Sequence, residues 1–503
     1  MAVEVKEGSE IQKAINQRKP KSVALRIVLV LIAVAIIAIG YFIPTPEGLS
    51  EGGKMAIAIM VAGMVLWVTE PVPIAVSGMA LMVLLPLFNV SPFLNVTDQA
   101  TGATTIGVWG NFISNVIFFV LASFGITAAL LKTKVPTKIV LSLMRLTKGS
   151  AKSTILVFML ATALMSSFVS NLPIIALFAG VAMSSIVELE QAQGDTKESR
   201  NLGKAMMIGI AYAGVMGGMI TPAGSALNIM TLNMLRAATA SSATGAINVA
   251  FLQWAAICAP IAIALVFISW LGVVAVFRVK RISDATLESL EQKSATIGRL
   301  EVFDYKVIVI FGLMIAAWIA SNWTGWDATM IALLGLAAFF LPGVDVLNWK
   351  EYVASVNWSV MLLTGCVQSI AGGIRDQGAA AWMFNSSLGK LTASAGVITF
   401  AAAAILPLIH LVVPVGPAII AISIFPLAGM APALGVSAVT FAIIIAFNAN
   451  ASFLLGLDSA NMMTYKYNQW TMKDFFIAGI IPTIVMVLIH TFCLNPLVAL
   501  MGF

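Results

Sequence analysis

The stretch FVSNLPIIALF, residues 168–178, decides the fold. It places a polar Ser–Asn pair and the helix-breaking Pro173 inside a run that is otherwise apolar. A continuous membrane-spanning helix disfavours these residues, because proline removes an intrahelical hydrogen bond and clashes with the preceding turn. The surrounding apolar run, 153–188, is also too long for one span, since about 20 residues cross the bilayer core. We therefore predict a re-entrant helical hairpin whose tip carries Ser170 and Asn171.

The composition indicates a membrane protein along the whole chain. Of the 503 residues, 60% are hydrophobic and only 10% are charged, whereas a soluble domain carries about 25% charged residues. Apolar segments of spanning length recur, and they lack the short alternating pattern of a transmembrane barrel. The predicted fold class is an all-α polytopic membrane protein with about eleven spans plus two re-entrant hairpins. The predicted spans lie near 25–44, 55–69, 72–90, 113–131, 205–235, 250–277, 305–320, 328–342, 357–374, 437–464 and 475–500.

The placement of lysine and arginine predicts the orientation. With a cytoplasmic N-terminus, 24 of the 28 Lys and Arg residues fall in segments on the cytoplasmic side, as the positive-inside rule requires. Treating either hairpin as a single span would invert everything after it. We expect a multi-pass protein of a bacterial plasma membrane, with its C-terminus extracellular. Since position explains the net charge of +6, we expect no nucleic-acid partner.

A second interrupted run, 397–430, indicates that the chain repeats itself. Its proline-containing interruption, 414–417, corresponds to the Ser–Asn tip of the first run. The segment SALNIMT from residue 225 resembles SANMMT from residue 459, 234 positions later. Each half thus orders a hairpin before a broken helix, which is typical of transporters built from inverted repeats.

Physical chemistry predicts what these interruptions do. Irregular backbone is tolerated at membrane depth only where it is buried in protein or lines a cavity. Two hairpin tips and two broken helices that meet near mid-membrane would form such a site. Their helix N-termini would turn partial positive charge toward an anion. The substrate-binding candidates are Ser170, Asn171, Leu172, Thr221, Pro222, Gly224, Ser225, Pro414, Val415, Gly416, Pro417, Ser452 and Ser459.

Four further residues are structural or coupling candidates: Asn228, Asp458, Asn461 and His410. Asp458 is the one acid in the apolar stretch 447–464, and an intramembrane carboxylate is a functional candidate by default. It would coordinate a cation, carry a proton or pair with a protein donor. For His410 we favour a structural role. The sequence holds no Ser–His–Asp pattern, phosphate loop or metal cluster, so we expect no enzyme, no cofactor and no metal site.

These motifs resemble those of the divalent anion/sodium symporters, the DASS carriers. Ser170 and Asn171 match the family's Ser-Asn-Thr tip, whereas Leu172 replaces its threonine. Val415, Gly416 and Pro417 occupy the second tip, which does not match. Thr221, Pro222 and Asn228 match the first broken-helix motif. In the second, Ser452 and Asn461 fit, but the usual Thr-Pro is missing.

The resemblance implies a homodimer with a scaffold domain and a transport domain that moves like an elevator. It also implies that the substrates are di- or tricarboxylates. The expected parts are a cytoplasmic tail (1–24), scaffold helices (25–152 and 241–396), transport parts (153–240 and 397–470) and a last span (471–503).

The departures at the tips lead to a functional hypothesis. Sodium needs several oxygen ligands, and both tips lack side-chain oxygens that the family uses. We therefore predict a sodium-independent exchanger of dicarboxylates such as 2-oxoglutarate, succinate, malate and fumarate, with the lipid bilayer and a second copy as its other partners. A sodium-coupled dicarboxylate symporter is the first alternative and a cation/proton antiporter is the second. A membrane receptor or structural protein is disfavoured by the paired hairpins.

Overall fold

The computed structural model is predominantly α-helical. Of the expected cytoplasmic tail, residues 1–21 lie outside the described part of the chain, and so does Pro414. The described residues are 22–97, 104–144, 150–193, 196–240, 245–279, 299–383, 386, 394–412, 415–456 and 458–503.

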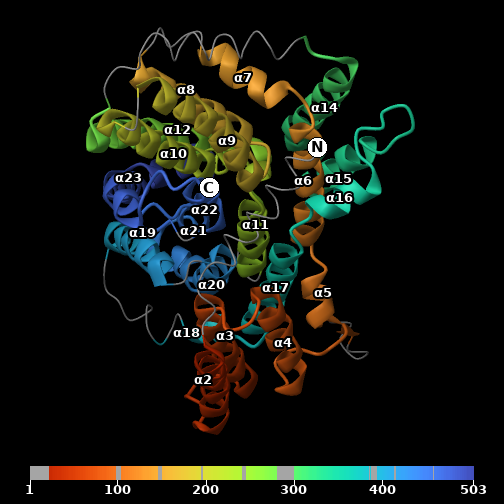
Figure 1. The fold of residues 1–503 in the computed structure, drawn as a ribbon. Helices are drawn as coiled ribbons and strands as arrows, with labels where there is room; N and C mark the ends of the chain where they lie inside the picture. The colour runs from red at the N-terminus through yellow and green to blue at the C-terminus, as the bar shows by residue number, and fades with distance from the viewer. Residues whose placement is uncertain are drawn as a thin grey trace. The chain divides into compact units, whose positions relative to one another are not determined.

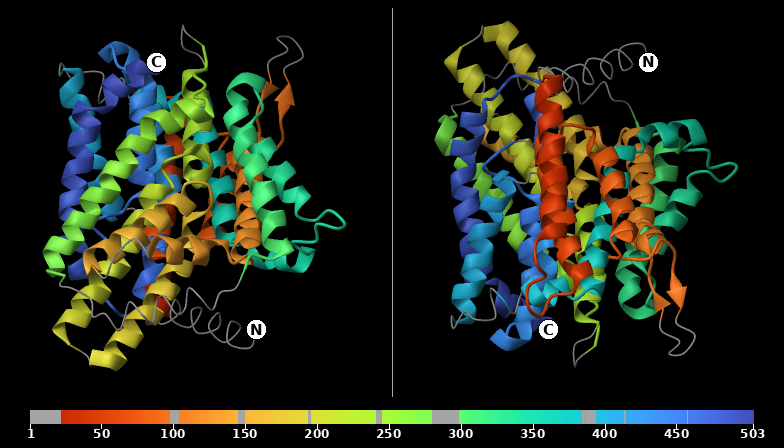
Figure 2. Two further views of the ribbon diagram at one scale, coloured as in Figure 1. Left: turned by 90° about the horizontal axis from the view of Figure 1, so that it is seen from above. Right: turned by 90° about the horizontal axis from the view of Figure 1, so that it is seen from below.

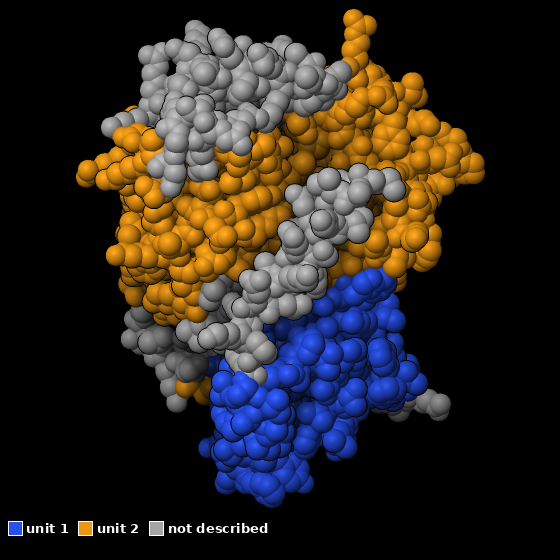
Figure 3. All heavy atoms as spheres, in the orientation of Figure 1, with its two compact units in different colours: residues 1–114, 358–385 blue, residues 115–357, 386–503 orange. Residues whose placement is uncertain are grey.

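The chain forms two compact units, which Figure 3 colours separately. Unit 1 comprises residues 1–114 and 358–385, and unit 2 comprises residues 115–357 and 386–503. The elements of unit 1 are α2 (Val23–Phe42), α3 (Glu51–Thr69), α4 (Ile74–Leu87), β1 (Val96–Thr97), β2 (Thr104–Thr105), α5 (Val108–Phe112), α17 (Trp358–Asp376) and α18 (Ala379–Met383). The two short strands pair antiparallel, with Val96 opposite Thr105.

Unit 2 contains the two interrupted runs and both broken helices (Figure 1). The predicted transport parts therefore both lie in unit 2, while the division into a scaffold and a transport domain stays a prediction. The elements of unit 2 are α6 (Asn115–Leu131), α7 (Val135–Met144), α8 (Ala151–Ser166), α9 (Asn171–Gln193), α10 (Lys197–Gly217), η1 (Pro222–Gly224), α11 (Ala226–Thr239), α12 (Phe251–Phe277), α14 (Val302–Thr324), α15 (Ala328–Ala338), α16 (Trp349–Ser355), α19 (Ala395–Val412), α20 (Gly416–Leu434), α21 (Ala438–Asn450), α22 (Ser459–Tyr465), α23 (Met472–Phe492) and α24 (Leu494–Leu500).

The helices have the length and apolarity that a membrane requires. Within the described residues, five helices are long and apolar enough to cross a membrane, or six if one bent pair counts as a single span. Shorter apolar helices of 10–17 residues accompany them, and pairs of these build the interrupted segments. The predicted class, an all-α polytopic membrane protein, is confirmed. The number of eleven spans stays a prediction.

Both interrupted runs are helix–turn–helix hairpins. In the first, α8 ends at Ser166 and α9 begins at Asn171, so Pro173 stands in the first turn, where its missing N–H costs nothing. In the second, α19 ends at Val412 and α20 begins at Gly416. Each hairpin packs against the broken helix of its own half: α8 and α9 lie along α10, and α19 and α20 lie along α21 (Figures 1 and 2).

In each half of the chain, one long helix packs against helices of the other half. In unit 2, α6 of the first half packs against α15 and α16 of the second half. In unit 1, α17 of the second half packs against α3, α4 and α5 of the first half. Each exchanged helix follows a short helix, α5 before α6 and α16 before α17. This reciprocity is what an inverted repeat predicts, because the same element takes the same role in both halves.

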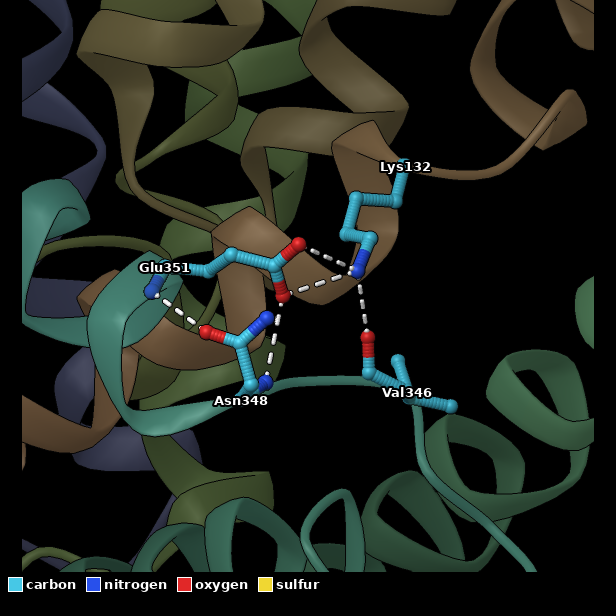
Figure 4. Close-up of polar contacts among 4 residues, drawn as sticks. All are labelled: Lys132, Val346, Asn348 and Glu351. Atoms are coloured by element: carbon cyan, nitrogen blue, oxygen red, sulfur yellow. Dashed lines mark hydrogen bonds and ion pairs between the residues drawn. The ribbon is translucent and has the colours of Figure 1, made fainter.

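A pair of related contacts holds the exchanged helices at their C-terminal ends. Just after α6, Lys132 Nζ donates to the Val346 carbonyl at 2.8 Å and to Glu351 Oε2 at 2.9 Å (Figure 4). Just after α17, Gln377 Nε2 donates to the Val90 carbonyl at 2.8 Å. Both valines are buried. Each valine therefore presents a main-chain carbonyl that needs a donor, and the side chain just after the exchanged helix supplies this donor.

Candidate substrate site at two broken helices

The first break covers residues 218–225, between α10 and α11. Pro222 has no N–H, so it cannot donate to the carbonyl four residues before it, that of Gly218. Asn228 supplies the missing donor: its Nδ2 lies 2.8 Å from the Gly218 carbonyl and 2.9 Å from the Thr221 carbonyl. Asn228 is completely buried. A side-chain amide thus replaces the main-chain bond that the proline removes.

The second break covers residues 451–458, between α21 and α22. Asn461 Nδ2 donates to the Ser452 carbonyl at 3.0 Å and to Asp458 Oδ2 at 3.2 Å. Ser452 follows Gly218 by 234 positions, and Asn461 follows Asn228 by 233. The same asparagine-to-carbonyl bond therefore recurs at equivalent places, which supports the internal repeat at the level of single hydrogen bonds.

A polar cluster joins the two breaks. Asn450, the last residue of α21, donates through Nδ2 to Asn228 Oδ1 at 3.2 Å. Its Oδ1 lies 2.6 Å from Ser225 Oγ. We call these three residues, Ser225, Asn228 and Asn450, the central cluster. Since Ser225 and Asn228 belong to the first half and Asn450 to the second, the cluster ties the halves together where both backbones are irregular.

The first hairpin tip, residues 167–170, lies against the first break. Ser166 Oγ lies 2.7 Å from Asn171 Oδ1, and Thr221 Oγ1 donates to the Ser167 carbonyl. A Cβ placed on Gly218 would lie 2.2 Å from Asn171 Oδ1. A side chain at this position would therefore force the Asn171 side chain to move.

The second hairpin approaches both broken helices at the start of α20. Val415 is the N-cap of α20, and Gly416 and Pro417 form its first turn. A Cβ placed on Gly416 would lie 2.6 Å from the Ala449 carbonyl oxygen and 2.6 Å from Leu227 Cδ1. The start of α20 thus meets the end of α21 and the start of α11.

The predicted substrate-binding residues divide by exposure. The hydroxyls of Thr221 and Ser452 are already used, since Thr221 donates to the Ser167 carbonyl and Ser452 to the Leu455 carbonyl at 2.5 Å. These two residues shape the breaks. The buried members are Thr221, Pro222, Gly224 and Ser452; the half-buried members are Ser170, Asn171, Leu172, Ser225, Val415, Gly416 and Pro417; Ser459 is exposed.

Asp458 and His410 both have protein partners. Asp458 is the N-cap of α22, and its Oδ1 accepts from the main-chain N–H groups of Ala460 at 2.5 Å and Asn461 at 3.4 Å. Of its three predicted roles, the geometry supports pairing with protein donors, because a helix N-terminus stabilises a carboxylate. His410 Nδ1 lies 2.5 Å from the Asn448 carbonyl oxygen, which supports the structural role.

Sequence reasoning missed three residues that hold the breaks in place. Asn450 was visible as part of an Asn-x-Asn pair just before the second break. Trp254 Nε1 donates to the Met219 carbonyl at 3.0 Å, and Tyr212 OH lies 3.0 Å from the Phe453 carbonyl. These two aromatic residues sit in apolar helices, so no local signal in the sequence points to them.

A surface pocket of about 360 Å³ lies elsewhere, at the N-terminal ends of α6 and α15. Its one charged lining residue, Asp327, caps α15 by accepting from Thr329 N at 2.8 Å. None of the predicted site residues lines it. The chemistry of the breaks, not this pocket, defines the candidate site.

Paired hairpins, two broken helices and one helix exchanged by each half together are the features of a polytopic membrane transporter. Comparison with known proteins gives the family. Residues 24–500 match the model of the family described as the sodium:sulfate symporter transmembrane region. The chain belongs to this family, which corresponds to the divalent anion/sodium symporters and consists of membrane transporters, not enzymes.

The sequence identity to individual relatives is low. The chain is 25% identical over 358 residues to the sodium-dependent dicarboxylate transporter SdcS of Staphylococcus saprophyticus. The SdcS protein of Staphylococcus aureus gives the same identity. These matches cover 67% of this chain and 65% of the relative's length.

Two solved structures share the fold. The YdaH transporter of Alcanivorax borkumensis gives a TM-score of 0.51 at 13% identity, over 87% of this chain and 98% of that chain. MtrF of Neisseria gonorrhoeae gives a TM-score of 0.54 at 11% identity, over 95% of this chain and 96% of that chain. At these identities the likeness concerns the fold alone.

Proposed function

We propose that this protein is a secondary transporter that exchanges dicarboxylates across the plasma membrane without coupling to sodium. The substrates are short dianions such as 2-oxoglutarate, succinate, malate and fumarate. The hairpins and broken helices of unit 2 carry the substrate together, in an elevator motion, within a homodimer. Family membership and the names of the relatives support dicarboxylates as the substrate class.

One observation carries the sodium-independent form of the proposal. Hard cations prefer several oxygen ligands, and the tips offer few free ones. Leu172, Val415 and Gly416 bring no side-chain oxygen. Beside the first tip, Asn171 Oδ1 lies 2.7 Å from Ser166 Oγ, whose single proton is also within reach of the Gly214 carbonyl at 2.6 Å. The remaining polar groups favour an anion, because main-chain N–H groups and helix N-termini carry partial positive charge.

The sodium-coupled symporter is the second candidate function. It is favoured by the name of the relatives, which are sodium-dependent dicarboxylate transporters. The two candidates differ in what an empty carrier does. An exchanger crosses the membrane only when loaded, whereas a symporter also returns unloaded.

The test is uptake of labelled succinate into proteoliposomes that contain the purified full chain. We expect uptake only when the vesicles are preloaded with a dicarboxylate, and at the same rate in sodium and in choline buffers. Vesicles without protein and vesicles without internal dicarboxylate are the controls. Uptake into unloaded vesicles that requires external sodium would establish the symporter and refute exchange.

The cation/proton antiporter receives less support from the geometry. Such a carrier needs a carboxylate free to bind and release its cation. Asp458 instead accepts hydrogen bonds from two main-chain N–H groups at the start of α22 and from the side-chain Nδ2 of Asn461. Exchange that survives Asp458→Asn would agree with the proposed function, while its complete loss would favour the antiporter.

A further inference from the structure

The central cluster fixes the direction of each of its hydrogen bonds. The carbonyls of Gly218 and Thr221 can only accept, so the group of Asn228 that faces them must be its NH₂. Asn228 Oδ1 is then an acceptor, and Asn450 must donate to it.

The same reasoning extends through Asn450 to Ser225. Asn450 Nδ2 also donates to the Ala446 carbonyl at 2.9 Å, so two acceptors confirm the orientation of this amide. Asn450 Oδ1 therefore faces Ser225 Oγ, at 2.6 Å. Because an amide oxygen cannot donate, the single hydroxyl proton of Ser225 is committed to Asn450.

This assignment leaves Ser225 as an acceptor in the site. Its oxygen has two lone pairs, and one of them receives the main-chain N–H of Leu227 at 3.3 Å. Ser225 is half-buried, and among the described residues its oxygen has no recorded donor besides Leu227 N, which leaves the other lone pair for a ligand. A carboxylate oxygen placed there would find no donor, whereas a substrate hydroxyl would donate.

We propose that Ser225 selects dicarboxylates that carry a hydroxyl group over those that do not, and that Asn450 is the positioning residue that enforces this selection. This inference rests on the proposed dicarboxylate transport. Malate is the hydroxyl-bearing probe, and succinate is the matched probe without the hydroxyl.

The experiment measures competition in proteoliposomes. Unlabelled malate and succinate compete with labelled fumarate, and the ratio of their half-inhibitory concentrations reports selectivity. In Ser225→Ala we expect the preference for malate relative to succinate to fall about 2- to 10-fold, the worth of one hydrogen bond. A general loosening of the site affects both probes alike and leaves the ratio unchanged.

Two variants at Asn450 separate orientation from packing. Asn450→Ala releases the Ser225 proton, so the ratio should fall as in Ser225→Ala. Asn450→Asp keeps an acceptor for Ser225 and loses the donor to Asn228, so the ratio should stay near that of the wild type. Ser321→Ala is the control, since the Ser321 hydroxyl bonds within its own helix to the Trp318 carbonyl at 2.6 Å.

The outcomes distinguish this inference from the proposed function. Transport by Ser225→Ala with an unchanged ratio would overturn the inference and leave dicarboxylate transport intact. A ratio that falls in Asn450→Asp as far as in Asn450→Ala would overturn the positioning role of Asn450. A wild-type protein that moves no dicarboxylate would overturn the proposed function itself, and the inference with it.

Discussion

Asn228, which donates to the carbonyl left unpaired at the first break, should contribute strongly to the stability of unit 2. Asn228→Leu removes the donor to the Gly218 carbonyl and keeps a side chain of similar size. That carbonyl is buried, and Pro222 cannot replace the donor. A buried unpaired carbonyl costs about 1–3 kcal/mol. Loss of the bond from Asn450 adds about 0.6–1.7 kcal/mol, the range measured for polar contacts between membrane helices.

The equivalent change in the second half provides a matched comparison. Asn461→Leu also orphans one carbonyl, that of Ser452, and it removes the 3.2 Å bond to Asp458 Oδ2. It breaks no bond between the halves, because Asn461 Oδ1 has no hydrogen-bond partner among the described residues. We therefore expect similar losses for the two changes, about 2–5 kcal/mol each. Only Asn228→Leu removes a bond between the halves, so only this change should couple to a change at Asn450.

Equilibrium unfolding in mixed detergent–SDS micelles measures these free energies. A double-mutant cycle of Asn228→Leu with Asn450→Leu isolates the bond between the halves and should give a coupling of about 0.6–1.7 kcal/mol. Ser321→Ala should stay within about 0.5 kcal/mol of the wild type. Zero coupling between the changes at positions 228 and 450 would refute the reasoning.

Two other contacts give simpler tests. Gly416→Ala should destabilise the protein by about 1–3 kcal/mol and slow transport, because its Cβ would lie 2.6 Å from the Ala449 carbonyl oxygen. Gly429→Ala in the same helix meets nothing within 4 Å, so equal effects of the two changes would disprove the steric argument. The Lys132 ammonium, which donates to both carboxylate oxygens of Glu351, holds the pKa of that carboxyl below its ordinary value. The stabilisation is therefore complete above the unfolded pKa of about 4.3 and is lost as the pH falls below it. Thermal unfolding should show a gap between wild type and Glu351→Gln that closes over this range, and a gap independent of pH would contradict the assignment.

The sequence predicts the interruptions well because their causes are local. Pro173 and Pro222 each remove a main-chain donor, which a membrane helix tolerates poorly. Each proline is easy to recognise in the sequence because the residues around it are apolar. The hairpin at 153–188 is confirmed as two helices for this reason. The position of the irregular turn is less predictable. It lies at residues 167–170, before the proline, because proline is well tolerated in the first turn of the helix that follows.

The partners across the breaks could not be predicted, because they depend on how the halves pack. Trp254 and Tyr212 hold the Met219 and Phe453 carbonyls, yet each looks like an ordinary apolar residue within its helix. The exchange of α6 and α17 between the halves could not be predicted either. The apolar pattern of a helix shows that it is buried or in lipid, but not which helix it packs against. An offset of 234 residues relates Met219 to Phe453, but only the structure shows that Trp254 Nε1 donates to the first carbonyl and that the Tyr212 hydroxyl lies between the Phe453 carbonyl at 3.0 Å and the Phe475 carbonyl at 2.8 Å.

The asparagines at both breaks suit the electrostatics of the proposed site for an anion inside a membrane. A freed carbonyl needs a donor, and lysine or arginine would provide one at the cost of burying a full charge. An amide donates without net charge, and its oxygen remains available to accept from a second element. Asn228 uses both functions, since Nδ2 holds the first break and Oδ1 receives Asn450 from the other half. The two irregular backbones are thereby joined by neutral groups. If the proposed dicarboxylate binds here, its attraction is left to helix N-termini and main-chain N–H groups, whose partial charges can hold an anion and still release it.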